Sequence, residues 1–482
     1  MKAIVKEKSH TDQADRNSLR FKFFSASEFS ATFSIALPFA IGYMGEKLIS
    51  ITDSIMLGRL GPEALSASGL ALSIYNLIMV GGFGMLFPMI VLAAHARGSN
   101  RFQTIPLIIR QGLWVCGALT VIGSVILWHV TPILILAGQD PGIAHMAGDY
   151  MRFYLWTLFP VFTTFMFFLA FAAMGRAGTA ALIVWSEVAL NAIFDYVLVF
   201  GRFGFPALGM EGAGLASIIA YGAGHMAFFI LLAFHRFYRR TALFRHAWWP
   251  RWHLLKRFFH LGVPKSFEVL MRTGLYSSFS LLSGWMGTQA LVIYTIVFET
   301  AMVIFYMAAA IANAGATRIG MAYAGKDHES VWHALSSTML IMAMFLTLPV
   351  LVFVIFPEWV AILFLGFGSS AAKTLTPFLS PVLVWTALFL IAEGLRVVMV
   401  QTLNGLSDMK IPAIIGAFLY WAVAFPLGAL LGFTAGFHVL GFWIGLTLGV
   451  AAIAVTYMVR FRRLMGALSA RQGMPGPSHQ GR

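Results

Sequence analysis

Long runs of apolar residues recur along the whole chain, and short segments rich in glycine, proline and charged residues separate them. A helix needs about 20 apolar residues to cross the hydrocarbon core of a bilayer. The pattern predicts twelve such helices, at residues 29–52, 66–94, 105–128, 148–173, 179–200, 212–235, 258–283, 289–315, 332–356, 378–403, 411–433 and 437–459. The predicted fold class is therefore an all-α integral membrane protein.

Composition supports this interpretation, because 59% of the 482 residues are hydrophobic and only 11% are charged. The first 28 residues carry mixed charges without the apolar segment of a signal peptide, so they predict a solvated tail. Cys116, the single cysteine, lies within the third predicted helix, where we expect it only to pack.

The net charge of +14 is distributed unevenly among the loops. Basic residues gather in the N-terminal tail, in residues 236–257, and after the last helix at Arg460, Arg462 and Arg463. The positive-inside rule then predicts that both termini lie in the cytoplasm, with the helices in the inner or plasma membrane and the surplus charge against anionic lipids. A nucleic-acid partner is not expected, because no basic module with interleaved aromatic residues is present.

The two halves of the chain resemble each other in sequence. Residues 226 positions apart (264 minus 38) match in the first helix and loop of each half: Pro38 and Pro264, Gly58 and Gly284, Gly61 and Gly287. Internal repeats of this kind are common in secondary transporters. Six helices per half give both halves the same orientation, so we expect two pseudo-symmetric six-helix bundles with a central cleft between them.

This repeat divides the chain into a tail (1–28), an N-lobe (29–235), a basic linker (236–257), a C-lobe (258–461) and a second tail (462–482). Trp248, Trp249 and Trp252 of the linker are interpreted as anchors in the membrane interface. Gly81, Gly82 and Gly84 predict a helix that bends or packs closely, and Gly441, Gly445 and Gly449 predict close helix packing. The chain has no nucleotide-binding, metal-spaced or nucleophile motif, so we expect neither an enzyme nor a cofactor.

Charged side chains within apolar helices are costly, so they are the candidate functional residues. In the first helix, Glu46 and Asp53 are two turns apart and share one face. Glu187, Asn191 and Asp195 form one polar stripe on the fifth helix at i, i+4 and i+8. They are candidates to hold a proton or a cation, although Asp53 could also cap the helix end and Asn191 could simply lock two helices together.

The C-lobe differs at the equivalent positions, since Arg272 and Phe279 stand 226 residues after Glu46 and Asp53. Acidic and basic residues occur there at helical spacing: Glu268 with Arg272, and Glu393 with Arg396. Each pair can neutralise itself within its helix, or it can take part in coupling or substrate binding. Glu299 of the eighth helix either lines the cleft or extends its carboxylate toward the interface.

At several segments the chain resembles the multidrug and toxic compound extrusion (MATE) transporters, in particular their bacterial NorM-type members. These segments are "ITDSIMLGRLGPEALSA", "AMGRAGTAALIVWSEVALNAIFDYVLVFGRFGFPALGMEGAGLAS", "HLGVPKSFE" and "TLNGLSDMKIP". The resemblance covers about residues 29–460 and implies two six-helix bundles around a V-shaped cleft, and cation-coupled antiport of drugs or metabolites.

The resemblance also implies roles for individual residues. Asp53 matches the acidic residue of the family's first helix, and Asn191 and Asp195 match the polar pair of the fifth. Ser217 falls where many members have a hydroxyl residue, and Glu46 falls where glutamine is common. In the C-lobe, Glu393 stands where NorM-type members place an aspartate, but Arg272 replaces the glutamate that accompanies it there, which argues against a NorM-type sodium site.

The predicted function is proton-coupled antiport of lipophilic, often cationic compounds by a monomer in the cell membrane. Protonation of Asp53 would remove charge from the cavity, and a bend at Pro38 would act as the hinge that converts this into cleft closure. Sodium coupling is the main alternative, because carboxylate and amide oxygens also bind Na⁺. A lipid-linked oligosaccharide flippase would call for a basic cleft, and a receptor or scaffold would not need two repeats.

Overall fold

The structure is a computed structural model that describes residues 25–234, 249–366 and 370–472. Most of the predicted N-terminal tail, the last ten residues of the C-terminal tail, and residues 236–248 of the predicted linker with Trp248 lie outside the described residues.

The described residues form helices and no strands. The N-terminal half contains α2 (Ala26–Gly58), α3 (Pro62–Leu86), α4 (Pro88–Gly98), α5 (Ile105–Trp128), α6 (Val130–Leu136), α7 (Pro141–Tyr154), α8 (Leu158–Ala173), α9 (Ala177–Phe200) and α10 (Gly209–Phe234). The C-terminal half contains α12 (Trp252–Trp285), α13 (Thr288–Ala324), α14 (His328–Ile355), α15 (Pro357–Leu365), α16 (Ser370–Gly405), α17 (Lys410–Leu419), α18 (Phe425–Ala429) and α19 (His438–Gln472). Two π-helical turns, Tyr420–Ala424 and Leu430–Thr434, flank α18.

Every predicted membrane span lies within a helical segment of the structure, except for one or two residues at its ends. Ten segments of the described chain are long and apolar enough to cross a membrane by length and composition. The two remaining spans are α2 and α12, which carry charged residues along their middle. The chain is thus a multi-pass membrane protein with the twelve spans that the apolar pattern predicts.

Several helices extend beyond the predicted boundaries. α12 begins at Trp252, inside the predicted linker, and α19 continues to Gln472, inside the predicted C-terminal tail. Hydropathy detects only the part of a helix in the hydrocarbon core, whereas lysine and arginine are good helix formers that continue the helix into the polar region.

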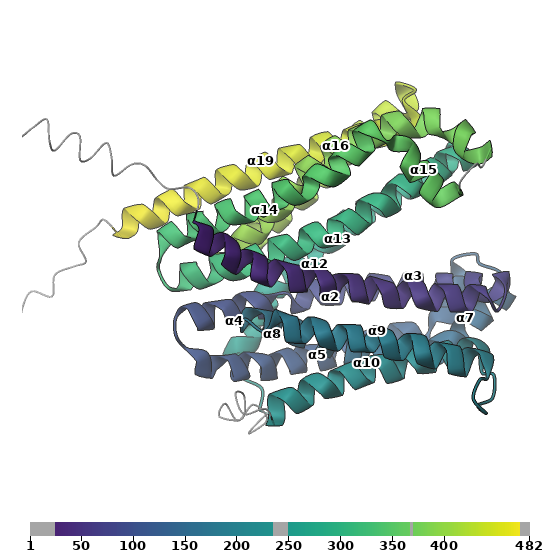
Figure 1. Cartoon of the computed structure of the whole chain (residues 1–482), viewed down its shortest axis with the longest axis horizontal. Helices are drawn as coiled ribbons and strands as arrows, with labels where there is room; N and C mark the ends of the chain where they lie inside the picture. The colour runs from purple at the N-terminus through teal and green to yellow at the C-terminus, as the bar shows by residue number, and fades with distance from the viewer. Residues whose placement is uncertain (1–24, 235–248, 367–369, 473–482) are drawn as a thin grey trace, which may run out of the picture.

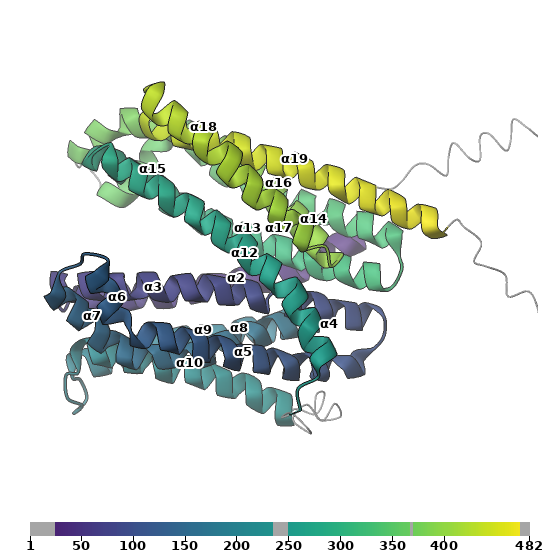
Figure 2. The same cartoon turned by 180° about the vertical axis from the view of Figure 1, so that it is seen from behind.

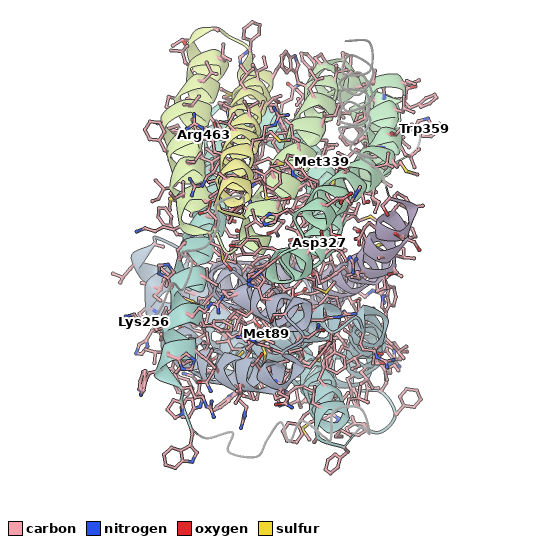
Figure 3. All side chains as sticks on the ribbon, turned by 90° about the vertical axis from the view of Figure 1, so that its left-hand side faces the viewer. Met89, Lys256, Asp327, Met339, Trp359 and Arg463 are labelled. Atoms are coloured by element: carbon pink, nitrogen blue, oxygen red, sulfur yellow. The ribbon has the colours of Figure 1, made fainter. Side chains whose placement is uncertain are left out.

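The helices form two bundles, one from α2 to α10 and one from α12 to α19 (Figures 1 and 2). The bundles meet near the end of the molecule where the chain termini lie and diverge toward the other end (Figure 1). Seen from the terminal end, α12 with Lys256 rises from the first bundle into the second, and Asp327 lies near the boundary between the two bundles (Figure 3).

The repeat detected in sequence has a structural basis. Gly61 and Gly287 precede α3 and α13 with φ of +132° and +109°, a conformation that disfavours side chains. Pro38 and Pro264 both lie inside the first long helix of their bundle, which continues through them. The same backbone is thus used twice.

Both glycine-rich stretches pack closely, as predicted. Gly82 faces the ring of Phe162, and Gly84 lies against the backbone of Ser266 in the other bundle, where a Cβ would be only 2.6 Å from its Cα. In α19, the stripe of Gly441, Gly445 and Gly449 lies against backbone atoms of the segment 424–432. Small residues allow the helices to approach this closely. Close packing stabilises helix association in a bilayer, because lipid tails are as apolar as the side chains and there is no hydrophobic driving force between helices.

Polar contacts join the bundles where they meet. Arg318 of α13 donates to Glu28 of α2 through Nε (3.1 Å) and Nη2 (2.5 Å). Nε2 of His95 lies 2.7 Å from the carbonyl oxygen of Gly405, and Asn313 donates to the hydroxyl of Tyr43 at 2.7 Å. These bonds hold the two bundles together at the terminal end.

Candidate functional site

Asp53 lies on the buried face of α2 and is only 1% exposed. Its carboxylate accepts two hydrogen bonds from other helices of the first bundle. Nδ2 of Asn191 in α9 donates to Oδ1 at 2.9 Å, and Oγ of Ser217 in α10 donates to Oδ2 at 3.2 Å. Asp53, Asn191 and Ser217 therefore form one buried cluster, and Asp53 does not cap the end of its helix.

Asp195 completes this cluster. It is fully buried, and the carboxyl group of Asp53 lies close enough for a hydrogen bond when one of the two carries a proton. Both carboxylate oxygens of Asp195, Oδ1 of Asn191 and the hydroxyl of Tyr150 are buried without a hydrogen-bond partner. Among the described residues no basic side chain forms an ion pair with either aspartate, so two acidic groups share a site without a counter-charge.

Glu46 and Glu187 line a separate small cavity of the same bundle. Aromatic rings form much of its wall: Tyr43, Phe165, Phe168 and Tyr221. Thr164 donates to Oε1 of Glu187 at 3.4 Å, and Gly224 leaves room for that carboxylate, because a Cβ at position 224 would overlap it. The polar stripe of α9 is buried as its spacing predicts, but it serves two places, with Glu187 in this cavity and Asn191 and Asp195 at Asp53.

The C-lobe residues pair differently from the sequence-based expectation. Glu393 and Arg396 do pair within α16, with Nε to Oε2 at 2.7 Å and Nη2 to Oε1 at 2.6 Å. The expected pair of Glu268 with Arg272 is wrong. Glu268 instead accepts from Nζ of Lys265 at 2.5 Å.

Arg396 reaches across from α16 to Oε1 of Glu268 at 3.5 Å, and Nη1 of Arg272 lies 3.6 Å from Oε1 of Glu393. Spacing along one helix cannot predict these contacts, because they depend on how α12 and α16 face each other. Lys265 was not recognised as part of the cluster, although its i, i+3 spacing to Glu268 was a usable signal.

Glu299 of α13 is part-buried and forms no ion pair within the described ranges. It lies within electrostatic range of Tyr306, as do Glu46 and Arg272. The hydroxyl of Tyr306 thus stands near acidic groups of both bundles and near one basic group of the second.

Tyr150 of α7 is the main site residue that sequence reasoning missed. Its side chain is 1% exposed, and its hydroxyl lies within electrostatic range of Asp53 and Asp195. A tyrosine in an amphipathic segment carries no sequence signal of this kind, since only the packing of α7 against α3 and α10 brings it to the aspartates.

The Asp53 cluster offers carboxylate and hydroxyl oxygen atoms and one side-chain amide as possible ligands for a cation. Hard cations such as Na⁺ bind to oxygen, and a proton needs only one carboxylate. In the part of the chain that the structure describes, no group of three or more His, Cys, Asp or Glu residues could hold a metal ion. The arrangement can therefore exchange a proton or bind a weakly held monovalent cation.

Comparison with known proteins gives a consistent result. The sequence model of the family described as MatE matches residues 38–197 and 264–430. The chain is 32% identical over 441 residues to "Probable multidrug resistance protein NorM" of Mesorhizobium japonicum, covering 90% of this chain and 94% of that protein. It is 32% identical over 448 residues to the protein of the same name from Rhizobium meliloti, covering 92% and 95%.

The fold also matches solved structures. A crystal structure of a Vibrio cholerae MATE transporter superposes with a TM-score of 0.83 at 18% identity, and the match covers 92% of this chain and 98% of the other. At that identity the likeness shows the fold alone.

Proposed function

The chain belongs to the MatE family, and on that premise we propose that it is a secondary active transporter that exports lipophilic, often cationic organic compounds in exchange for a coupling cation. Members of this family are transporters rather than enzymes. The curated relatives are named as probable multidrug resistance proteins, which supports drugs and toxic compounds as its substrates.

The observation that carries the coupling proposal is the unneutralised pair of Asp53 and Asp195. Two buried carboxylates without a basic partner repel each other and lose their hydration, so binding one positive charge between them is favourable. Asn191 and Ser217 fix the orientation of Asp53 and leave Asp195 free to take up that charge.

The proton is the preferred coupling ion in this proposal. Each oxygen of Asp53 already accepts a hydrogen bond from Asn191 or Ser217, which reduces the capacity of this carboxylate to bind a metal ion. Sodium is a hard cation, and by analogy with calcium and magnesium sites we expect it to prefer about six oxygen ligands. A shared proton needs only the contact between the two carboxyl groups. Sodium remains the alternative, with the free oxygens of Asp195 and Asn191 as ligands.

In this proposal export occurs because the cationic compound and the coupling proton compete for the same carboxylates of the N-lobe. A cationic compound is held while the carboxylates are ionised, and protonation from the outer side removes the attraction and releases it. The rocking of two rigid bundles about their contact would expose the site alternately to the two sides. Pro38 leaves the carbonyl of Ser34 without its helical partner, which makes this part of α2 the proposed hinge.

The proposed orientation places both chain termini in the cytoplasm, on the evidence of the basic residues around the terminal end. We propose a monomer in the cell membrane that contacts anionic lipids through these residues. A flippase for lipid-linked oligosaccharides is less well supported, since Glu46, Asp53, Glu187 and Asp195 make the N-lobe acidic.

The experiment that tests the coupling site is drug efflux from proteoliposomes under separate pH and sodium gradients. Asp53→Asn removes the titratable group but keeps its shape, and we expect efflux driven by the pH gradient to be lost. Asp149→Asn is the matched control, because Asp149 lies on the surface of α7 with its side chain 64% exposed. Full activity of Asp53→Asn would refute the assignment, and efflux that follows only the sodium gradient would favour Na⁺.

A further inference from the structure

A continuous chain of side-chain hydrogen bonds crosses from the second bundle to the first. Within α16, Nδ2 of Asn404 donates to Oε1 of Gln401 at 2.6 Å. Nε2 of Gln401 donates to Oδ1 of Asn313 in α13, and Nδ2 of Asn313 donates to the hydroxyl of Tyr43 in α2 at 2.7 Å. The three amide side chains are at most 6% exposed. Breaking the chain would leave buried polar groups without partners, which is unfavourable.

Every bond of this chain has its donor on the side of the second bundle. A tyrosine hydroxyl has one proton to donate and lone pairs that accept. Because the hydroxyl of Tyr43 accepts from Asn313, its own proton points away from the chain. Tyr43 lines the small cavity of the first bundle together with Glu46 and Glu187, and Glu46 lies one helical turn further along α2. The carboxylate of Glu46 is within electrostatic range of Tyr43, so it is the nearest acidic acceptor on α2 for that proton.

The ring of Tyr43 is held by the first bundle. Its centre lies 5.9 Å from that of the Phe39 ring and 6.0 Å from that of the Phe168 ring. Asn313 belongs instead to α13, which lies beside α2 where the bundles meet (Figures 1 and 2). The bond between Tyr43 and Asn313 therefore breaks when the two bundles separate at this place.

Close contacts of α4 with α13 and α16 close the same region. The side chain of Ala94 in α4 is fully buried, and a Cβ at Gly320 of α13 would lie only 3.3 Å from its Cβ. Nε2 of His95 lies 2.7 Å from the carbonyl oxygen of Gly405, the residue after Asn404. We call Ala94, His95, Gly320 and Gly405 the terminal seam. The hydrogen-bond chain and the terminal seam share α13 and α16, so they open together.

We propose that Tyr43 couples the state of the cavity lined by Glu46 and Glu187 to the closure of the terminal seam, through its bond to Asn313. An ionised Glu46 accepts the proton of the Tyr43 hydroxyl, which makes the hydroxyl oxygen a stronger acceptor for Asn313 and stabilises the closed seam. A neutral Glu46 withdraws this support. The inference rests on the proposed transport function and adds a positioning residue that links its cavity to the movement of the bundles.

The location of Tyr43 satisfies the requirement for such coupling. A group can shift a conformational equilibrium only when it interacts differently with the two conformations. The bond between Tyr43 and Asn313 exists only while the terminal seam is closed, so Glu46 acts through it on one conformation and not on the other. A buried hydrogen bond of this kind corresponds to about a fivefold change in an equilibrium constant, which leaves the opening reversible.

The opening of the terminal seam is measured by thiol labelling. The parent protein is the full-length chain in lipid nanodiscs with Cys116→Ala, which removes the native cysteine, and Ala94→Cys. A water-soluble maleimide reaches position 94 only when the bundles separate, because the side chain there is buried in the closed seam. The labelling rate is then proportional to the fraction of molecules with an open seam.

Tyr43→Phe keeps the ring and removes the hydroxyl, and it should raise the labelling rate about fivefold. Asn313→Leu should raise the rate at least as much, and the double variant should label no faster than Asn313→Leu alone, because the same bond is lost. Tyr294→Phe is the matched control. The hydroxyl of Tyr294 donates a buried hydrogen bond of 2.8 Å to the carbonyl oxygen of Tyr276 within the second bundle, so its loss should change the rate less than about twofold.

The link to the cavity needs its own test, since spatial continuity alone does not demonstrate coupling. Glu46→Gln replaces the charged acceptor by a neutral one of the same shape. It should raise the labelling rate about threefold in the parent protein, because the hydroxyl of Tyr43 loses a charge-assisted bond. In the Tyr43→Phe background the same substitution should leave the rate unchanged.

An unchanged rate in Tyr43→Phe, or an equal increase in Tyr294→Phe, would overturn the proposal. An effect of Glu46→Gln that is equal with and without the Tyr43 hydroxyl would also overturn it. So would the absence of labelling in every variant, because a seam that never opens needs no such link. Efflux of a cationic dye from proteoliposomes is measured on the parent as well. Labelling rates as expected without any efflux would contradict the proposed transport function and leave the coupling of cavity and seam standing.

Discussion

Replacement of Arg396 by glutamine is expected to destabilise the protein far more than the same change at Arg272. Arg396 is 1% exposed and donates three hydrogen bonds, two to Glu393 and one to Glu268. Removing one partner of a buried ion pair costs about 3–5 kcal/mol. We expect the lower end, about 3 kcal/mol, because Arg272 lies close enough to take over part of the charge of Glu393.

Arg272 contributes much less to stability by the same reasoning. It makes no hydrogen bond within the described residues, and its single ion contact, to Glu393, is 3.6 Å long. The ionic cluster of the C-lobe has three basic and two acidic side chains, so the loss of Arg272 also removes a surplus positive charge, and the expected cost is at most about 1 kcal/mol. The two substitutions are chemically identical, and each serves as the control for the other.

The assay is the midpoint of thermal loss of the monodisperse peak in size-exclusion chromatography. Unfolding of a protein of this size in detergent is not two-state, so the midpoints rank the variants rather than give free energies. We expect a decrease on the order of 5 °C for Arg396→Gln and less than about 2 °C for Arg272→Gln. Replacing both Arg396 and Glu393 by methionine should recover most of the loss, because an apolar pair of similar size needs no neutralisation. Equal decreases of the midpoint for Arg272→Gln and Arg396→Gln would refute the distinction between an arginine that stabilises the fold by hydrogen bonds and one that makes none.

Three further outcomes are expected. Gly445→Val should abolish the monodisperse peak in size-exclusion chromatography, because the valine side chain would collide with the backbone of α18. Gly466→Val should keep the peak, because a Cβ at position 466 would have no atom within 4 Å. Similar peaks for both variants would contradict this packing. Glu187→Gln should lower the affinity for a cationic dye such as rhodamine 123, measured by fluorescence anisotropy, by about tenfold, because it removes a buried carboxylate that attracts the cation. Glu63→Gln, at the exposed start of α3, is the control and should leave this affinity unchanged. Hydrogen bonds from the backbone and side chain of Ser330 lower the pKa of Asp327, so its cap stabilises α14 above the ordinary aspartate pKa of about 4 and loses this effect as the pH falls through the lowered value. Asp327→Ala should therefore speed hydrogen exchange in the first turn of α14 at pH 7 and have a progressively smaller effect as the pH falls below about 4. A pH-independent effect would count against the ionised cap.

The apolar pattern was sufficient to predict the twelve spans, because the length of a span is set by the bilayer and not by tertiary contacts. The repeat was also visible, since the backbone requires glycine at Gly61 and Gly287 in both halves. The Asp53 cluster could be anticipated, because a polar stripe on an apolar helix must face inward. The partners of Glu268 could not, since several bases compete for one carboxylate and the geometry between helices selects among them.

The two bundles have similar backbones but differ in how buried charge is neutralised. In the first, Asp53 accepts hydrogen bonds from neutral groups only, and neither oxygen of Asp195 has a hydrogen-bond partner among the described residues, so the charge of the pair depends on what binds from solution. In the second, Glu268 and Glu393 are each paired with a basic side chain, so their charge is neutralised within the protein. A coupling ion can change the relative energies of two conformations only where it binds them differently. A cluster that already contains its own cations gains little from a proton or a sodium ion, so we expect the response to the ion gradient to arise in the first bundle.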